Sequence, residues 1–145
     1  MPWLKNQELE KFLTGGPHIL RLATSSSDGW PAVNPVWYNY DGHLFTVAGR
    51  RQAKWVENIR NNPKVGMSID TSEVPYVRVL IRASAEIVDE HWMPDVPDRA
   101  RRYLGEKDGE AYFESKKHIA RALIRITPIE ITSWTGDWHP RYMEA

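Results

Sequence analysis

The alternation of apolar and polar positions predicts a chain built mainly of β-strands. Between Val77 and Ile87 every second residue is apolar, and Arg78, Arg82 and Glu86 lie between them. This period of two is typical of a strand with one buried face, here over residues 76–88. Similar patterns predict further strands at 18–26, 31–40, 43–48, 64–70 and, interrupted at Pro128, 122–134.

Helical spacing of apolar residues predicts short helices at 6–14, 52–62, 94–105 and 110–118. In the second of these, one set of residues shares the face that we expect to be buried: Gln52, Trp55, Val56 and Ile59. The set expected to face away consists of Lys54, Glu57, Asn58 and Asn61.

About six antiparallel strands with few helices predict a closed or nearly closed β-barrel. The predicted fold class is therefore mainly β, a six-stranded antiparallel split β-barrel with short peripheral helices. Its 145 residues suit one domain, with an N-terminal helix in 1–16, the barrel in 17–134 and a C-terminal tail in 135–145.

Composition narrows the possible functions. Nineteen basic and nineteen acidic residues give a formal net charge of zero, which argues against a general nucleic-acid or acidic-membrane binder. The absence of cysteine excludes a thiolate metal site and a cysteine nucleophile. No stretch resembles a signal peptide or a membrane span, so we expect a soluble, cytoplasmic protein.

The start of the helix at 52–62 is unusual because it is basic and lacks a capping residue. Arg50, Arg51 and Lys54 surround this start, where a cap of Ser, Thr, Asp or Asn and acidic residues are usual. A bound phosphate would satisfy both the amide groups and the cations. The alternative is a solvated basic loop on a water-capped helix.

Pro35 lies inside a predicted strand, where it removes one ladder N–H group. Neighbouring backbone groups could then bind a heterocycle with matching donors and acceptors. The alternative is a β-bulge or an edge strand.

Other conspicuous residues have ordinary structural explanations. Trp55 is predicted to be core, whereas Trp30 and Trp37 suit either ring stacking or a dimer contact. The five histidines show no metal-ligand spacing, so neither a metal site nor a catalytic histidine is assigned. A solvated helix face is expected for the charged residues Asp98, Arg99, Arg101 and Arg102.

The order of these elements resembles the pyridoxamine 5′-phosphate oxidase-like family of split barrels. The resemblance rests on 29–31 and 34–38, the Asp41–Gly42 hairpin, 45–47, 54–58, 62–65 and 79–87. It implies a flavin or deazaflavin cofactor, FMN or coenzyme F-420, and a homodimer whose sites are shared between subunits.

The resemblance also implies site residues. Cofactor contacts are expected from Asn34, Pro35, Val36, Trp37, Thr46, Val47, Ala48, Gly49, Arg50, Arg51, Gln52, Lys54 and Arg78. Residues expected to line a substrate pocket are Tyr38, Trp134, Trp138 and Arg141. The family implies hydride transfer to or from a small molecule; vitamin B6 oxidation itself is not expected, because a complete substrate-phosphate site is missing.

Two other functions remain open. The barrel could store a flavin-like cofactor without catalysis, or it could bind haem, for which His118 or His139 would have to serve as axial ligand.

Overall fold

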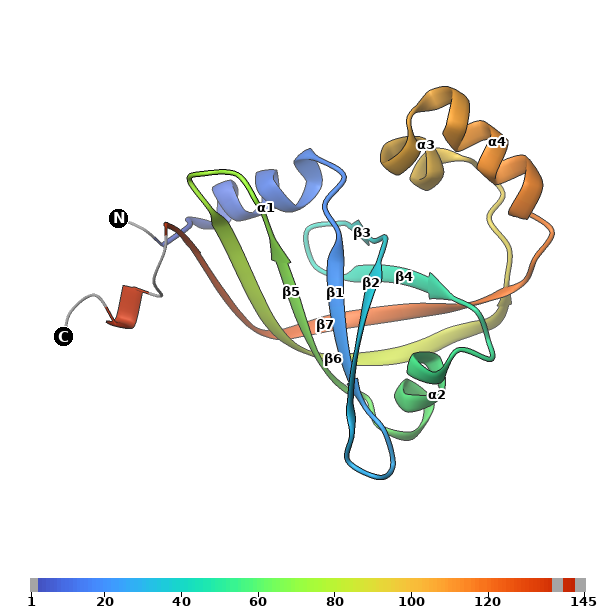
Figure 1. The fold of residues 1–145 in the computed structure, drawn as a ribbon, viewed down its shortest axis with the longest axis horizontal. Helices are drawn as coiled ribbons and strands as arrows, with labels where there is room; N and C mark the ends of the chain where they lie inside the picture. The colour runs from blue at the N-terminus through green and yellow to red at the C-terminus, as the bar shows by residue number, and fades with distance from the viewer. Residues whose placement is uncertain (1–2, 137–139, 143–145) are drawn as a thin grey trace.

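The computed structural model describes residues 3–136 and 140–142, and their strands form one antiparallel sheet (Figure 1). The order across the sheet is β2-β1-β5-β6-β7-β4-β3. The strands are β1 (Leu20–Ser25), β2 (Pro31–Val36), β3 (Asn39–Tyr40), β4 (Phe45–Gly49), β5 (Lys64–Asp70), β6 (Val77–Trp92) and β7 (Arg121–Thr135). The mainly β split-barrel prediction is confirmed.

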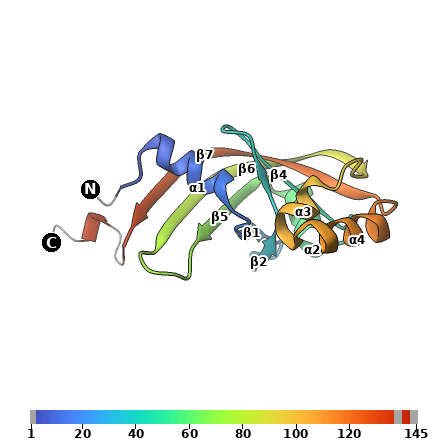
Figure 2. The same cartoon turned by 90° about the horizontal axis from the view of Figure 1, so that it is seen from above.

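Short helices lie around the sheet: α1 (Asn6–Gly15), α2 (Lys54–Asn61), α3 (Asp98–Leu104), α4 (Glu106–Lys116) and the 3-10 turn η1 (Pro140–Tyr142). Figures 1 and 2 place α3 and α4 at one end of the long strands and η1 at the opposite end. No helix in the described part of the chain has the length and apolar character needed to cross a lipid bilayer.

The two longest strands, β6 and β7, pair along nearly their whole length, with Ile81 opposite Ile131 and Ile87 opposite Ile124. Alternate residues of β6 from Val79 to Ala85 are buried, as the period of two predicted. These residues join one core with apolar side chains from β1, β4, β5 and α2. Burial of this continuous core is the main stabilising contribution to the fold.

The predicted strand at 31–40 is divided in two, which is why the sheet has seven strands rather than six. Pairing stops after Val36 and resumes at Asn39, and Trp37 and Tyr38 lie in the gap. β2 is an edge strand that pairs only with β1, where Pro35 stands opposite Arg21. The edge-strand interpretation of Pro35 is confirmed, because an edge position has no second ladder for proline to break, and binding of a heterocycle by the neighbouring backbone groups stays a prediction.

Helix α2 starts two residues later than predicted, and its N-cap residue Ala53 makes no side-chain capping hydrogen bond. The uncapped start is therefore confirmed. The predicted outward position of Asn58 is wrong: its side chain is buried, and Nδ2 donates to Thr24 Oγ1 at 3.0 Å. A polar residue can occupy this core position because β1 supplies a hydrogen-bond partner.

Candidate functional site

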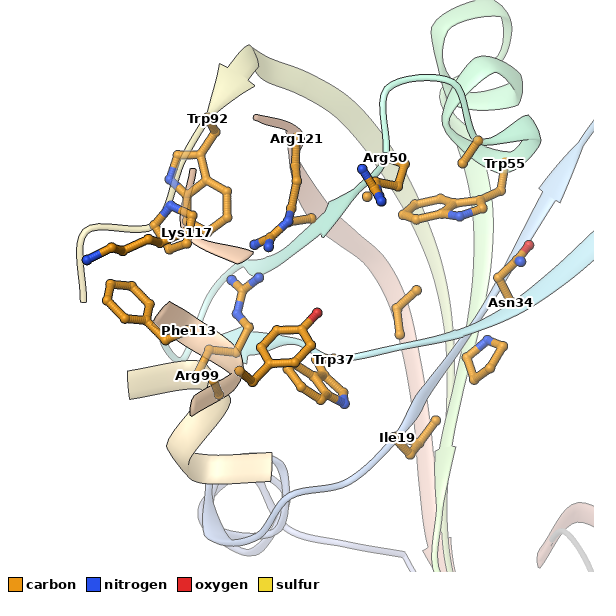
Figure 3. Close-up of a pocket in the computed structure, with 18 of the residues that line it drawn as sticks. Ile19, Asn34, Trp37, Arg50, Trp55, Trp92, Arg99, Phe113, Lys117 and Arg121 are labelled. Carbon is orange, nitrogen blue, oxygen red and sulfur yellow. The ribbon is translucent and has the colours of Figure 1, made fainter. Parts of the chain in front are cut away.

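A cavity of about 500 Å³ lies between the ends of β2 and β4 and the helices α3 and α4. Figure 3 shows aromatic rings and basic side chains arranged around it. The strands and the start of α2 supply one side: Ile19, Asn34, Pro35, Val36, Trp37, Ala48, Gly49, Arg50, Ala53 and Trp55. We call this the strand wall. The remaining residues form what we call the helix wall: Trp92, Pro94, Val96, Arg99, Ala100, Tyr112, Phe113, Lys117 and Arg121.

Gly49 allows the strand wall to form. A Cβ atom at this position would lie 2.3 Å from Cζ2 of Trp55 and 2.9 Å from Cγ2 of Val56, distances that real side chains do not tolerate. The glycine therefore lets α2 pack directly against the end of β4. As a result Trp55 belongs to the core, as predicted, and also lines the cavity.

The helix wall is held against the strands by stacked aromatic rings. Trp37, in the gap between β2 and β3, stacks on Tyr103 with ring centroids 4.9 Å apart and planes 9° apart. Tyr112 of α4 contacts the same indole at 5.3 Å in a tilted arrangement. Such contacts contribute beyond the area they bury. The break in the strand thus places Trp37 between the two walls.

Hydrogen bonds from α3 reinforce this contact. Tyr103 Oη donates to His18 O at 2.7 Å and accepts from Tyr38 N at 3.1 Å. Arg102 donates to Tyr38 O and to Gly16 O, each at 3.0 Å. The backbone N–H and C=O groups of Tyr38, in the gap between β2 and β3, therefore form hydrogen bonds with side chains of α3. These bonds fix the position of the helix wall.

The charge in the cavity is entirely basic. Among the described residues that line it, Arg50, Arg99, Lys117 and Arg121 are cationic and none is acidic. Lys117 pairs with Glu114 at 2.9 Å, whereas the ion pairs among described residues include none of the three arginines. Arg99 and Arg121 are half-buried, whereas Arg50 and Lys117 are exposed. Charges that are partly removed from water and left without a counter-ion favour an anionic ligand.

Arg99 is the most enclosed of these cations. Burial lowers the pKa of its guanidinium below the ordinary arginine value, and the charges of Arg102 and Arg121 lower it further. One nitrogen, Nη2, is 3.5 Å from Thr46 O, and it donates to the Asn39 amide oxygen at 3.2 Å when that amide is turned toward it. The guanidinium carbon lies 5.7 Å from the ring centroid of Trp92.

The predicted cofactor residues divide into two groups within this protomer. Seven line the cavity: Asn34, Pro35, Val36, Trp37, Ala48, Gly49 and Arg50. Six do not: Thr46, Val47, Arg51, Gln52, Lys54 and Arg78. Val47 is part of the core, and the side chains of Arg51, Gln52 and Lys54 are exposed beside the start of α2.

The predicted substrate-pocket residues do not line this cavity. Tyr38 is fully buried and donates its hydroxyl to Leu13 O at 2.7 Å. Trp134 pairs with Arg78 at the far end of β7, about 40 Å along the strand from Arg121 at a rise of ~3.3 Å per residue. Arg141 lies in η1 beyond it, and Trp138 is outside the described residues.

The helix wall is the part of the site that the sequence did not predict. The interpretation of α3 as a solvated face is wrong for Arg99 and Arg102, because α3 packs over the gap between β2 and β3. Asp98 is exposed as predicted. The available signal was the adjacent pair Tyr112 and Phe113 in a helix with almost no other apolar residues.

The comparison with family models matches residues 6–135 to the pyridoxamine 5′-phosphate oxidase family, and the chain belongs to that family. The resemblance inferred from the order of the elements is confirmed. Among functionally curated proteins, none matches the chain significantly.

Solved structures share the fold at low sequence identity. An F-420 reductase is 24% identical, with 83% of this chain and 94% of that chain covered and a TM-score of 0.64. An FAD-binding protein from Mesorhizobium loti is 21% identical, with 93% and 96% covered and a TM-score of 0.64. The haem storage protein of Vibrio cholerae is 20% identical, with 92% and 98% covered and a TM-score of 0.65. At these identities the likeness shows a shared fold.

Proposed function

We propose that this protein is an oxidoreductase that binds FMN or coenzyme F-420 and transfers a hydride to or from a small molecule. The observation that carries the proposal is the cavity itself, which has aromatic walls and, among the residues that the structure describes, three arginines without an acidic partner and no acidic lining residue. A planar ring would pack against the aromatic walls, and a phosphate-bearing side chain would pair with the arginines. The F-420 reductase and the FAD-binding protein with the same fold support this class of ligand.

The residues of this chain fit such a ligand in a definite way. The strand wall offers the edge strand β2 and Trp37 to a flat ring. We expect Arg50, next to the uncapped start of α2, to bind the phosphate together with Arg51 and Lys54, which lie outside the cavity with exposed side chains at the same helix start. When bound, the cofactor would supply the hydride chemistry, while the protein binds, orients and excludes water.

The test is a titration of the purified protein with FMN and with F-420. We expect one of them to bind, and Arg50→Ala to weaken that binding about tenfold or more through the loss of a charge-assisted hydrogen bond. Arg125→Ala is the matched control, because Arg125 is exposed on β7 and pairs with Glu86 at 3.2 Å. Retention of neither cofactor by the wild-type protein would contradict the proposal.

We also propose that the site is completed in a homodimer. Arg78, Trp134 and Arg141 are predicted site residues, yet the first two lie at the ends of β6 and β7 opposite the cavity and Arg141 follows in η1. Within one protomer they cannot reach it, whereas a second copy could supply them. Mixing Arg50→Ala and Arg78→Ala proteins tests this, since only a shared site allows a mixed dimer to regain one intact cofactor site.

A non-catalytic storage role is the second candidate, because no acidic or histidine side chain among the described residues lines the cavity to move a proton. Stopped-flow mixing of the reduced complex with candidate acceptors distinguishes the two roles. A storage protein would show no acceleration over the free cofactor. Of the two histidines considered as haem ligands, His118 does not line this cavity and His139 lies outside the described residues.

A further inference from the structure

Arg60, in the last turn of α2, links three parts of the chain beside the start of that helix. Its Nη2 donates to the backbone carbonyl of Arg51 at 3.1 Å. Its Nη1 donates to Glu57 of the same helix at 2.7 Å. Nε and Nη2 donate to the two carboxylate oxygens of Glu90 on β6, at 3.0 and 2.8 Å. Every nitrogen of this guanidinium therefore has an acceptor, which holds the group in one orientation.

The carbonyl that Arg60 contacts belongs to the turn that joins β4 to α2. Ala53 N donates to Arg50 O at 3.0 Å, which closes this turn. The next N–H, that of Gln52, has no acceptor among the described residues. Because the peptide bond between Arg51 and Gln52 is trans, its C=O and N–H groups point to opposite sides. A hydrogen bond on the carbonyl therefore also fixes the direction of the Gln52 N–H group.

The same turn carries the groups that we expect to bind the cofactor phosphate. Arg50 and Arg51 belong to it, and Lys54 follows as the first residue of α2, whose N-cap makes no side-chain hydrogen bond. Three cations so close in sequence repel one another when no anion is bound. An external contact that holds the turn before the ligand arrives removes part of the entropic cost of ordering it.

Arg60 holds this turn without taking part in the ligand site itself. It does not line the cavity, and its charge is already paired with the carboxylates of Glu57 and Glu90. The hydrogen bond from Arg60 lowers the pKa of the Glu90 carboxyl below its ordinary value, so this partner stays ionised at neutral pH. The positive charge of the turn is thus left for the ligand, while Arg60 supplies a fixed hydrogen bond to the backbone.

Other arginines in ion pairs are arranged differently. Among the described residues, Arg21, Arg101 and Arg125 each pair with a single carboxylate and donate to no backbone carbonyl. Their side chains are 40% or more exposed, whereas that of Arg60 is 27% exposed. Exposed single pairs contribute little to stability, whereas a guanidinium bonded at every nitrogen fixes the groups around it. The contrast indicates that Arg60 determines the geometry of the turn.

We propose that Arg60 is a positioning residue, which holds the turn between β4 and α2 in the conformation that binds the cofactor phosphate. This inference rests on the proposed function. Arg60 acts through the carbonyl of Arg51, and it ties that carbonyl to α2 and β6 at once. Loss of Arg60 should therefore weaken the binding of the phosphate. The contacts of the cofactor ring should stay unchanged, because β2 and Trp37 supply them.

The experiment is a fluorescence titration with ligands that differ in the phosphate: FMN against riboflavin, and F-420 against the same deazaflavin without its phosphate-bearing extension. We expect Arg60→Met to weaken the phosphate-bearing ligand about tenfold and the phosphate-free ligand about twofold or less. Arg60→Lys keeps the charge but not the planar fork and should restore part of the loss. Arg125→Met is the matched control and should change neither affinity. Equal losses for both forms, or no loss, would overturn the proposal.

A second variant separates the position of the turn from a simple effect of charge. Arg60→Met leaves Glu57 and Glu90 without their partner, and these carboxylates could repel a phosphate. Arg60→Met combined with Glu90→Gln removes one charge of each sign, so the net charge beside the turn is unchanged. The loss of affinity should persist in this double variant. Full recovery would show that repulsion caused the loss, and it would overturn the proposal.

Amide exchange of Ala53 provides a readout that needs no cofactor. Its N–H closes the turn, so it should exchange about tenfold faster in Arg60→Met than in the wild-type protein. An unchanged exchange rate would overturn the proposal. If the wild-type protein binds neither FMN nor F-420, the proposed function fails, and this exchange rate still decides whether Arg60 holds the turn. If Arg60→Met fails to fold, Glu90→Gln removes two of the hydrogen bonds of Arg60 and should show the same selectivity with a smaller loss.

Discussion

The two walls of the cavity are built by different means. The strand wall consists of hydrogen-bonded strand ends and the start of α2, and it is continuous with the core through Trp55. The helix wall stands on α3 and α4, which follow β6 and precede β7 and contact the strands through a few rings and hydrogen bonds. The first wall is thus part of the folded barrel, whereas the second is attached to it.

Because the walls differ in this way, we expect changes in the strand wall to affect the stability of the fold and changes in the helix wall to affect ligand binding. A change in the strand wall should destabilise the whole protein, because ladder pairing and core burial meet there. A change in the helix wall should act mainly on ligand binding, because α3 and α4 can open locally at a lower free-energy cost than the barrel. Each prediction below tests this separation.

The largest effect is expected from Gly49→Ala. The new Cβ would overlap Trp55 and force α2 away from β4, which we expect to cost about 3 kcal/mol of the free energy of unfolding. Urea denaturation measures the change. Gly15→Ala is the matched control, since no atom lies within 4 Å of a Cβ at that position. A stable Gly49→Ala protein would show that the strand wall is not rigidly packed.

Gly109→Ala tests the helix wall. A Cβ at this position of α4 would lie 2.5 Å from Cα of Arg101, so α3 and α4 would have to separate. We expect faster amide exchange in α3 and α4 and weaker binding of the cofactor, with a loss of about 2 kcal/mol or less in the free energy of global unfolding. A global loss equal to that of Gly49→Ala would contradict the difference between the walls.

A smaller effect is expected at the buried pair of Asn58 and Thr24. Thr24→Val removes the acceptor and leaves the Asn58 amide without its partner, which should cost about 1–2 kcal/mol. Asn58→Leu with Thr24→Val should recover part of that loss, because both polar groups are then removed. Urea denaturation of the single and double variants provides the measurement. No recovery in the double variant would indicate that packing, not hydrogen bonding, determines this contact.

The smallest effect concerns pH and His18, whose backbone carbonyl accepts a hydrogen bond from Tyr103 of α3. Burial lowers the pKa of His18, and the charge of Arg102 adds to the shift. The His18 imidazole is therefore protonated less readily in the folded protein than in the unfolded chain, where its pKa is about 6.5. Stability should fall as the pH drops below that value, and it should be unaffected by this group above it.

The measurement is the midpoint of urea denaturation between pH 5 and 8. His18→Gln should flatten the decline at the acidic end of this range, whereas His43→Gln, at an exposed hairpin, serves as the control. An equal fall of the urea midpoint with decreasing pH in His18→Gln and wild type would exclude His18 as the cause of that fall.

The sequence by itself determined where the strands lie, except for the division of 31–40 into β2 and β3, and it determined the uncapped start of α2. These follow from local features: the period of two in β6, the missing cap before Lys54, and the proline that only an edge strand accepts at position 35. Each depends on neighbours within a few residues along the chain, which is the range over which periodicity and capping operate.

Only the tertiary structure decided that α3 and α4 form one wall of the cavity. The charges of α3 resemble a solvated helix face, and nothing local shows that Arg99 turns toward Arg121 or that Arg102 reaches Gly16. The burial of Asn58 depends in the same way on Thr24. In each case the partner is many residues distant, and side-chain pairing over such distances is fixed by packing rather than by the local pattern.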